Sequence, residues 1–253
     1  MTPTAHQDPA AFYTAGYSLD DHERSLKMGR WRAIGARSKA AHAVELCSRA
    51  GVEPARVVEI GCGDGALLAA LSELWPAARF DGFELSAPAV EIARGRSIPR
   101  VERLEAYDGS RVPVEDGAYD LAILSHVLEH VPDPEPLLAE AARVARHVLV
   151  EVPLENNRSA ARPAKRAISA SIGHLHAFDR SSVRALAARA GVRPVAELAD
   201  PLGHEHHAFF AETAKARVAA AAKWAVRSLS HRAHAPSAER FFTVHYAVLA
   251  EAR

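Results

Sequence analysis

The chain has 253 residues, enough for one large α/β domain with additions, and about half of them are hydrophobic. Its 31 lysines and arginines balance 31 aspartates and glutamates, so no strong net field attracts nucleic acid. Cys47 and Cys62 are too few for a disulfide framework, and we interpret both as reduced thiols. Because we find neither a signal-peptide pattern nor an apolar run of membrane-spanning length, we expect a cytoplasmic protein.

Short β-rich runs alternate with helical patterns from residue 56 onward. Strands are expected over residues 56–60, 78–85, 101–106, 119–125, 147–153, 192–198 and 240–250. Helices are expected over residues 36–50, 65–75, 87–94, 134–146, 180–191 and 209–229. Strands separated by helices predict a mostly parallel sheet with right-handed crossovers.

The two ends of the chain differ from this regular middle part. Residues 1–35 contain Tyr13 and Tyr17 and have no strand partner of their own, so they are expected to form a lead-in or lid. Residues 36–253 are expected to form the main domain. Within it, residues at about 204–239 form a helical insert before the last strand.

The most informative stretch is VVEIGCGDGALL, where a strand ends, glycines occupy positions 61, 63 and 65, and a helix begins. Glycine is needed where the backbone approaches a ligand closely or takes a positive φ, and a helix N-terminus offers free N–H groups. The spacing differs from the dinucleotide pattern G-x-G-x-x-G. Glu59 would repel a pyrophosphate, but it suits a cofactor that carries an ammonium and a sulfonium. A tight glycine turn without any ligand is the alternative.

Later strand ends extend this site. Glu84 ends the second strand and can accept hydrogen bonds from both hydroxyls of a ribose, although a solvated acid is the alternative. Asp108 follows the third strand and can accept from an adenine amino group. Ser125 and His126 end the fourth strand, beside the expected position of a methionine moiety.

Four runs in order, VVEIGCGDG, FDGFELS, AYDGSRVPVEDGAYDLAILSHVLEHVPDP and GHLHAFDRSSVRALAARAG, resemble the motifs of class I S-adenosylmethionine-dependent methyltransferases. The resemblance covers residues 56–198 and is closest to the subgroup that acts on small molecules, quinones and sugars. It implies a Rossmann-like, seven-stranded, mostly parallel sheet of order 3-2-1-4-5-7-6, flanked by helices, with an antiparallel last strand. It also implies that S-adenosyl-L-methionine is bound by Glu59, Gly61, Cys62, Gly63, Gly65, Glu84, Leu85, Asp108, Gly109 and Ser125.

Two histidines are candidates for the general base. Methyl transfer requires alignment of acceptor, methyl and sulfur, and an oxygen acceptor must also lose a proton. His126 ends the fourth strand and His174 follows the fifth, both on the side where open α/β sheets bind ligands. The alternative is that His126 only packs against the cofactor and that His174 holds a loop.

Three polar segments flank the expected acceptor site. His204, Glu205, His206 and His207 could hold a divalent metal, but neighbours on one loop rarely converge on one ion, so we favour a polar lid and assign no metal ligand. Two basic stretches have no acid and could bind an anionic or sugar-containing acceptor, lie on an anionic membrane, or be solvated. The first holds Arg158, Arg162, Lys165 and Arg166, and the second has five basic residues between positions 215 and 232.

We therefore expect a methyltransferase that acts on a small polar acceptor, most simply by O-methylation of a sugar or secondary metabolite. One alternative is a lipid or quinone headgroup at a membrane surface. Another is a non-catalytic cofactor-binding or regulatory protein of the same fold. A nucleic-acid substrate is not expected, because the chain is neutral and SHVLEH stands where an Asn-Pro-Pro-Tyr-type motif would follow the fourth strand.

Overall fold

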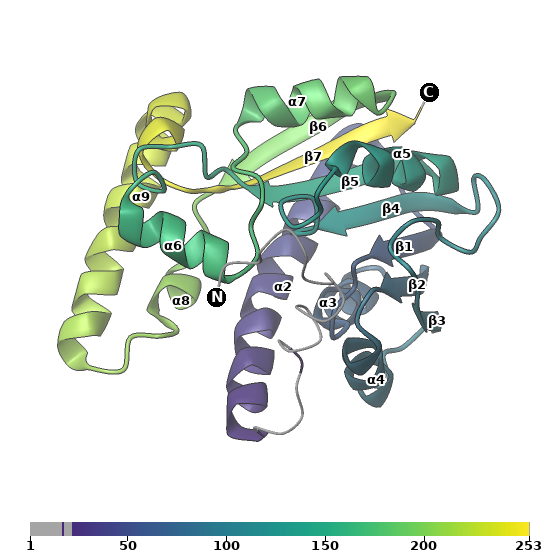
Figure 1. The fold of residues 1–253 in the computed structure, drawn as a ribbon, viewed down its shortest axis with the longest axis horizontal. Coiled ribbons are helices and arrows are strands. Elements are labelled where there is room, and N and C mark those ends of the chain that lie inside the picture. Colours follow the sequence, from purple (N-terminus) through teal and green to yellow (C-terminus); the bar gives the residue numbers. More distant parts are fainter. Residues whose placement is uncertain (1–16, 18–21, 253) are drawn as a thin grey trace.

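The computed structural model describes residue 17 and residues 22–252 (Figure 1). Seven strands form one sheet in the order β3-β2-β1-β4-β5-β7-β6. They are β1 (Arg56–Ile60), β2 (Arg79–Glu84), β3 (Val101–Ala106), β4 (Tyr119–Ser125), β5 (Ala145–Pro153), β6 (Val192–Asp200) and β7 (His245–Ala252). β1 to β5 pair in parallel, whereas β7 is antiparallel to both β5 and β6. The expected order and the expected mostly parallel sheet are confirmed.

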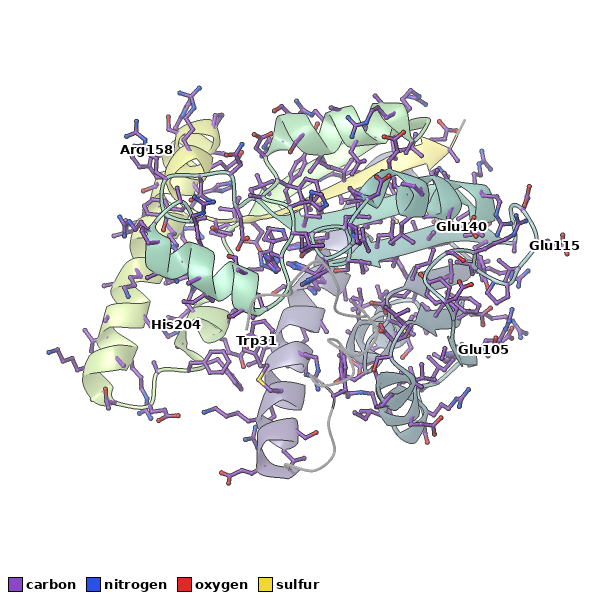
Figure 2. All side chains as sticks on the ribbon, in the orientation of Figure 1. Trp31, Glu105, Glu115, Glu140, Arg158 and His204 are labelled. Atoms are coloured by element: carbon purple, nitrogen blue, oxygen red, sulfur yellow. The ribbon has the colours of Figure 1, made fainter. Side chains whose placement is uncertain are left out.

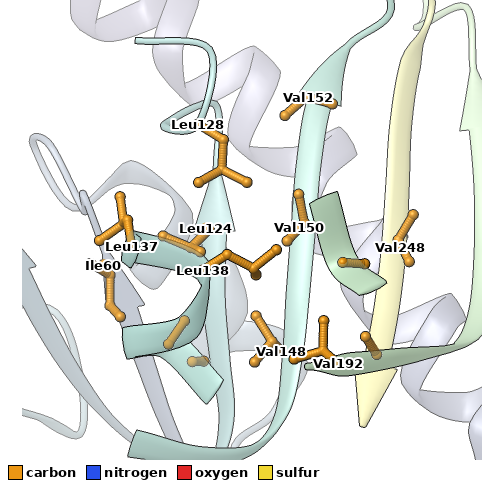
Figure 3. Close-up of a cluster of buried hydrophobic side chains, with 14 of the residues drawn as sticks. Ile60, Leu124, Leu128, Leu137, Leu138, Val148, Val150, Val152, Val192 and Val248 are labelled. Atoms are coloured by element: carbon orange, nitrogen blue, oxygen red, sulfur yellow. The ribbon is translucent and has the colours of Figure 1, made fainter. Parts of the chain in front are cut away.

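Helices cover both faces of the sheet (Figure 1). They are α2 (His22–Ala50), α3 (Ala66–Leu74), α4 (Ala87–Gly95), α5 (Pro134–Val144), α6 (Pro163–Ser171), α7 (Arg180–Arg189), α8 (His204–Ala208) and α9 (Ala214–Phe241). On one face, Leu46 of α2 and Leu68 of α3 share a buried cluster with strand residues such as Leu121. On the other, Leu138 of α5 and Leu186 of α7 pack in a second cluster, part of which is shown in Figure 3. Each such leucine contributes about 1.5–3 kcal/mol when fully buried.

Local sequence signals set several helix starts. The Ser86 side chain accepts a hydrogen bond from the N–H of Ala89 at the start of α4. Asp133 precedes a proline at the first position of α5. Asp179 and Ser182 form a reciprocal capping box at α7. These caps stand at the starts that the sequence predicted for the three helices.

Four segments differ from the expectation. α2 begins at His22 instead of residue 36, and α6 forms within the basic stretch, where no helix was expected. α9 runs on to Phe241, so β7 begins only at His245. The alanine-rich sequence favours this longer helix, and non-helical backbone at His234 places Pro236 early in the following segment, where proline is tolerated. Within the described residues, no helix is long and apolar enough to span a bilayer.

Candidate active site

The loop between β1 and α3 has the backbone that its glycines require. Gly61, Gly63 and Gly65 have φ values of +83°, +52° and +73°, in the left-handed region. A Cβ atom on Gly61 would lie 2.5 Å from Cγ2 of Val127, and one on Gly63 would lie 2.6 Å from Oη of Tyr17. Any side chain at these positions would therefore meet both backbone strain and a close neighbour.

Asp64, which the sequence analysis did not single out, anchors this loop. Its buried carboxylate accepts hydrogen bonds from Arg32 Nε at 2.8 Å and Arg96 Nη2 at 2.7 Å. Arg96 Nε also donates to the Asp64 carbonyl at 2.5 Å. Asp64 stands between two glycines in the sequence, but no motif marks either arginine, and each lies 32 residues away from Asp64.

Two acids meet the glycine loop from neighbouring strands. Glu84 at the end of β2 accepts from the N–H groups of Gly63 at 2.8 Å and Ser86 at 2.9 Å, which fixes its carboxylate toward the loop. A carboxylate bound in this way keeps lone pairs for further donors, such as hydroxyls. Oε2 of Glu59 is buried and has no hydrogen-bond partner within the described residues, and burial raises the pKa of Glu59 well above its ordinary value. A buried acid with one unpaired oxygen beside the loop fits a cationic ligand group, which would favour its ionised form.

The loop after β3 lies against the end of β2. A Cβ atom on Gly109, where φ is +80°, would be 3.4 Å from Leu85 Cδ1. The exposed carboxylate of Asp108 accepts from the N–H of Ser110 at 2.8 Å and from its hydroxyl at 2.6 Å, and these hydrogen bonds lower the pKa of Asp108. Asp108 is thus held in its own turn, with its second oxygen left for an outside donor.

The remaining predicted cofactor residues lie in the same region of the sheet. Cys62 is buried in the glycine loop, and burial raises the pKa of its thiol. Ser125 ends β4, and its buried Oγ has no hydrogen-bond partner in the described part of the chain. Because parallel strands β1, β2, β3 and β4 all end here, these residues share one edge of the sheet.

Tyr17 lies over this loop. The guanidinium of Arg32 is 4.9 Å from the centre of its ring, and burial raises the pKa of the Tyr17 phenol. Tyr13, the other tyrosine of the expected lid, lies outside the described residues.

Beyond the cofactor loop, a chain of acids and imidazoles crosses the sheet. His42 of α2 joins Asp200 of β6, with Nε2 to Oδ2 at 3.0 Å, to Glu151 of β5, with Nδ1 to Oε2 at 3.2 Å. The other oxygen of Glu151 lies 3.2 Å from Nδ1 of His245, and that nitrogen lies 3.0 Å from Nε2 of His126. Four elements, α2, β5, β6 and β7, and the residue after β4 thus contribute one polar side chain each. The sequence analysis found only His126 among them.

At the buried centre of this side-chain network, Glu151 and His42 are both charged. Burial opposes the ionisation of Glu151, but hydrogen bonds from His245 and His42 hold its pKa well below the ordinary value. Burial also opposes protonation of His42, yet hydrogen bonds to Asp200 and Glu151 raise its pKa to about 9. At neutral pH, His42 is therefore an imidazolium between two carboxylates.

His126 lies in an environment that disfavours its protonated form and occupies both of its ring nitrogens. Burial, followed by the charges of Lys39 and His245, lowers its pKa well below the ordinary value. Its Nδ1 lies 2.9 Å from Oε1 of the buried Glu129, while Nε2 faces His245. Both ring nitrogens of His126 are thus in contact with protein groups.

His174 is paired with a single acid. Its Nδ1 lies 2.8 Å from Oε2 of Glu155, and its ring packs edge-on against that of His130 at 4.8 Å between centroids. Burial opposes protonation, but the hydrogen bond to Glu155 raises the pKa of His174 above its ordinary value. A carboxylate on Nδ1 orients the ring and leaves Nε2 as the proton acceptor.

The loop that carries His174 is attached to the segment that borders the glycine loop. The N–H groups of Leu175 and His176 donate to the Glu129 carbonyl at 2.7 and 3.2 Å. Val127, two residues earlier, is the side chain that faces Gly61. The β4–α5 connection therefore borders the cofactor loop on one side and holds the histidine loop on the other.

Within the part of the chain that the structure describes, two groups of side chains could accept a divalent cation. One is Glu129, His130 and His174, and the other is His126, Glu151 and His245; within each group, one potential ligand atom per residue lies within 4.8 Å of the others. Members of the second group already bond to one another. In the first, Oε1 of Glu129 lies 2.9 Å from Nδ1 of His126, but within the described residues neither Glu129 oxygen accepts a hydrogen bond of good geometry.

The cluster of histidines around α8 does not converge. The ring of His204 packs against Trp224, Glu205 pairs with Arg37 at 2.9 Å, and Nε2 of His207 lies 2.8 Å from the Pro201 carbonyl. The basic stretch nearby is mostly exposed. Its members Arg162, Lys165 and Arg166 lie at the start of α6, while the guanidinium of Arg158 stacks over Phe241 at 4.9 Å.

Comparison with known proteins agrees with this geometry. A family model described as "Methyltransferase domain" matches residues 30–197. The chain is 30% identical, over 62% of its own length and 62% of the relative's, to malonyl-[acyl-carrier protein] O-methyltransferase of Geobacter sulfurreducens. It spans less than two thirds of the length of such curated relatives.

Solved structures share the fold at low identity. An S-adenosylmethionine-dependent methyltransferase of Thermotoga maritima, named as a possible histamine N-methyltransferase, matches with a TM-score of 0.60 and 17% identity, covering 97% of this chain and 100% of that one. Geranyl diphosphate C-methyltransferase of Streptomyces coelicolor, in complex with Mg²⁺, geranyl diphosphate and S-adenosyl-L-homocysteine, matches with a TM-score of 0.61 and 16% identity, covering 85% and 81%. With its glycine loop, its strand-end acids and its sheet order, this chain belongs to the family of class I S-adenosylmethionine-dependent methyltransferases.

Proposed function

We propose that this chain methylates a hydroxyl oxygen of a small polar acceptor, such as a sugar or secondary metabolite, with His174 as the base. The observation that carries the proposal is the His174–Glu155 pair, held at 2.8 Å on a loop bonded to the β4–α5 connection. S-adenosylmethionine, when bound, supplies an electrophilic methyl group. The cofactor would be held by Glu59, Gly61, Gly63 and Glu84. The other residues around it would be Cys62, Gly65, Leu85, Asp108, Gly109 and Ser125.

The protein's own groups handle the proton. Nε2 of His174 would take the proton from the acceptor hydroxyl as that oxygen is methylated. Glu155, bonded to Nδ1, stabilises the imidazolium that forms. His126 is less suited to this role because both its nitrogens contact protein groups and its pKa is lowered. We assign it to positioning the β4–α5 connection.

Two outer segments complete the proposal. The lid expected over residues 1–35 is supported by the position of Tyr17 above Gly63, whereas residues 22–35 belong to α2 and the rest of the lead-in lies outside the described residues. The exposed bases Arg162, Lys165 and Arg166, together with Arg158, attract an anionic or sugar-linked acceptor to the α6 side of the site.

The test is an acceptor panel read out as S-adenosylhomocysteine formation. Hydroxyl acceptors, the same compounds as methyl ethers, and matched amines are each incubated with wild type, His174→Ala and His176→Ala. We expect turnover of hydroxyl compounds only, a loss of about 10²–10⁴-fold in His174→Ala, and little change in the neighbouring control. Turnover of amines alone, or near-normal turnover by His174→Ala across pH 6–9, would refute the base assignment. Cofactor binding without turnover of any acceptor would favour the regulatory alternative.

A lipid or quinone headgroup is the second candidate acceptor. The specific feature in its favour is the outward face of α9, which is apolar and flanked by bases.

A further inference from the structure

α9 is an unusual helix for a protein surface. Val218, Val226 and Leu229 are 71%, 55% and 63% exposed, although large aliphatic side chains on surface helices normally face the core. With 100° per residue, these three positions and Ala222 fall within a sector of roughly 80° of the helix circumference. The buried positions of α9 are only Ala220, Ser228 and Ala238. The helix therefore presents an apolar stripe, defined here as residues 218, 222, 226 and 229, to the outside.

Basic residues border this stripe. By the same helical geometry, exposed Lys223 lies on one side of it, exposed Arg232 on the other, and Lys215 at its amino-terminal end. No ion pair joins these three to an acid of the described chain, and α9 contains no acid before Glu239. Before the kink at His234, the stripe extends over about 17 Å of helix and its basic border over about 26 Å.

The position of α9 leaves this face open. The helix is the outermost element on its side of the molecule, beyond α8, with Trp224 Nε1 bonded to the Leu202 carbonyl on its inner side (Figure 1). At its far end, the Arg158 N–H donates to the Arg240 carbonyl at 2.9 Å, which brings the basic lead-in of α6 beside α9 (Figure 2). α6 carries exposed Ile168, is followed by exposed Ile172 and leads directly into the His174 loop.

We propose that the outward face of α9 docks this protein on an anionic lipid bilayer. Aliphatic side chains would enter the headgroup boundary, while the flanking lysine and arginine would meet lipid phosphates. A second copy of the chain is a poorer occupant, because a two-fold contact would place Lys223 and Arg232 against the same bases of its neighbour. The inference goes beyond the proposed function, because docking is measured without any acceptor and does not depend on the identity of the base.

The test is flotation of the full-length protein with vesicles of phosphatidylcholine alone or mixed with phosphatidylglycerol. We expect binding to the anionic vesicles only, weakening as salt rises. Lys223→Glu/Arg232→Glu and Val226→Asp/Leu229→Asp should each weaken binding on the order of 10-fold or more. The matched control, Arg111→Glu/Arg146→Glu, reverses two exposed bases elsewhere and should bind like wild type.

Several outcomes would overturn the proposal. They are absence of binding at low salt, equal binding to neutral vesicles, and equal weakening by the control pair. Binding to soluble polyglutamate but not to vesicles would point instead to an acidic protein partner. A wild-type dimer that Val226→Asp/Leu229→Asp dissociates would show that a second copy covers the stripe. Circular dichroism and thermal unfolding confirm that each variant is folded.

Discussion

The cofactor side and the acceptor side of the site are built in contrasting ways. The cofactor side is local: the glycine loop, Glu59 and Glu84 lie within 26 consecutive residues, and the backbone itself makes many of the contacts. The side that we propose for the acceptor is assembled from distant side chains, since His42, Glu151 and His245 come from α2, β5 and β7. One side depends on backbone shape, whereas the other depends on buried charge.

This difference has a physical consequence. The shape of the glycine loop is fixed by its backbone conformation and by close neighbours such as Val127. The loop therefore adapts little to a different ligand. A buried network of imidazoles and carboxylates can change with single substitutions while the sheet remains. We infer that the acceptor side holds this chain's specificity and much of its sensitivity to pH.

Removing the central acid should have the largest effect. Glu151→Ala leaves imidazolium His42 without its buried partner, so we expect a loss of about 3–5 kcal/mol in unfolding free energy, measured in urea. Glu205→Ala, which removes an exposed ion pair to Arg37, should cost less than about 1 kcal/mol. Equal losses of unfolding free energy in the two variants would mean that the buried network stabilises the fold no more than an exposed ion pair does. Cofactor affinity of the folded Glu151→Ala protein should stay near wild type.

The pH dependence of stability should report His42. Its pKa is raised from 6.5 to about 9 on folding, so its stabilisation is fully present below pH 6.5 and is lost as the pH rises to 9. The difference in unfolding free energy between wild type and His42→Gln should therefore shrink by about 3 kcal/mol over that window. A difference that stays constant from pH 6.5 to 9 would show that His42 is not charged in the folded protein.

The lid proposal predicts a moderate effect of cofactor on proteolysis. Limited digestion should cut before residue 22 in the free protein, and S-adenosylhomocysteine should slow this cleavage several-fold. Digestion within residues 204–239 provides the internal control, because that segment is not part of the lid. Equal slowing at both places, or no slowing, would contradict a lid confined to the cofactor side.

Metal removal should have the smallest effect. If His174 serves as the base, treatment with EDTA and passage over a chelating resin should leave turnover within about twofold. A large loss that Mg²⁺ or Mn²⁺ restores, and that Glu129→Gln abolishes, would show that the Glu129, His130 and His174 group holds a cation.

Sequence patterns predicted the two sides of the site unequally. The alternation of strands and helices, the glycine loop and Glu84 lie in contiguous runs with regular spacing, and the family resemblance implied the strand order; the structure has all of them where they were expected. Glu155, a partner of His174, had no motif that would mark it. His42 and Asp200 are 158 positions apart and meet only because α2 crosses the end of β6. Helix α6 was missed because its start reads as a basic loop.

The central claim is that cofactor holding and proton removal are separable. Single-turnover methyl transfer at saturating S-adenosylmethionine tests it directly, by comparing Glu84→Ala with His174→Ala. Loss of the Glu84 contacts should weaken cofactor binding by about 1–3 kcal/mol, so saturation should restore a near-normal rate. His174→Ala should bind cofactor normally and remain at least about 100-fold slow. A near-normal rate in saturated His174→Ala, or a persistent defect in saturated Glu84→Ala, would contradict the account.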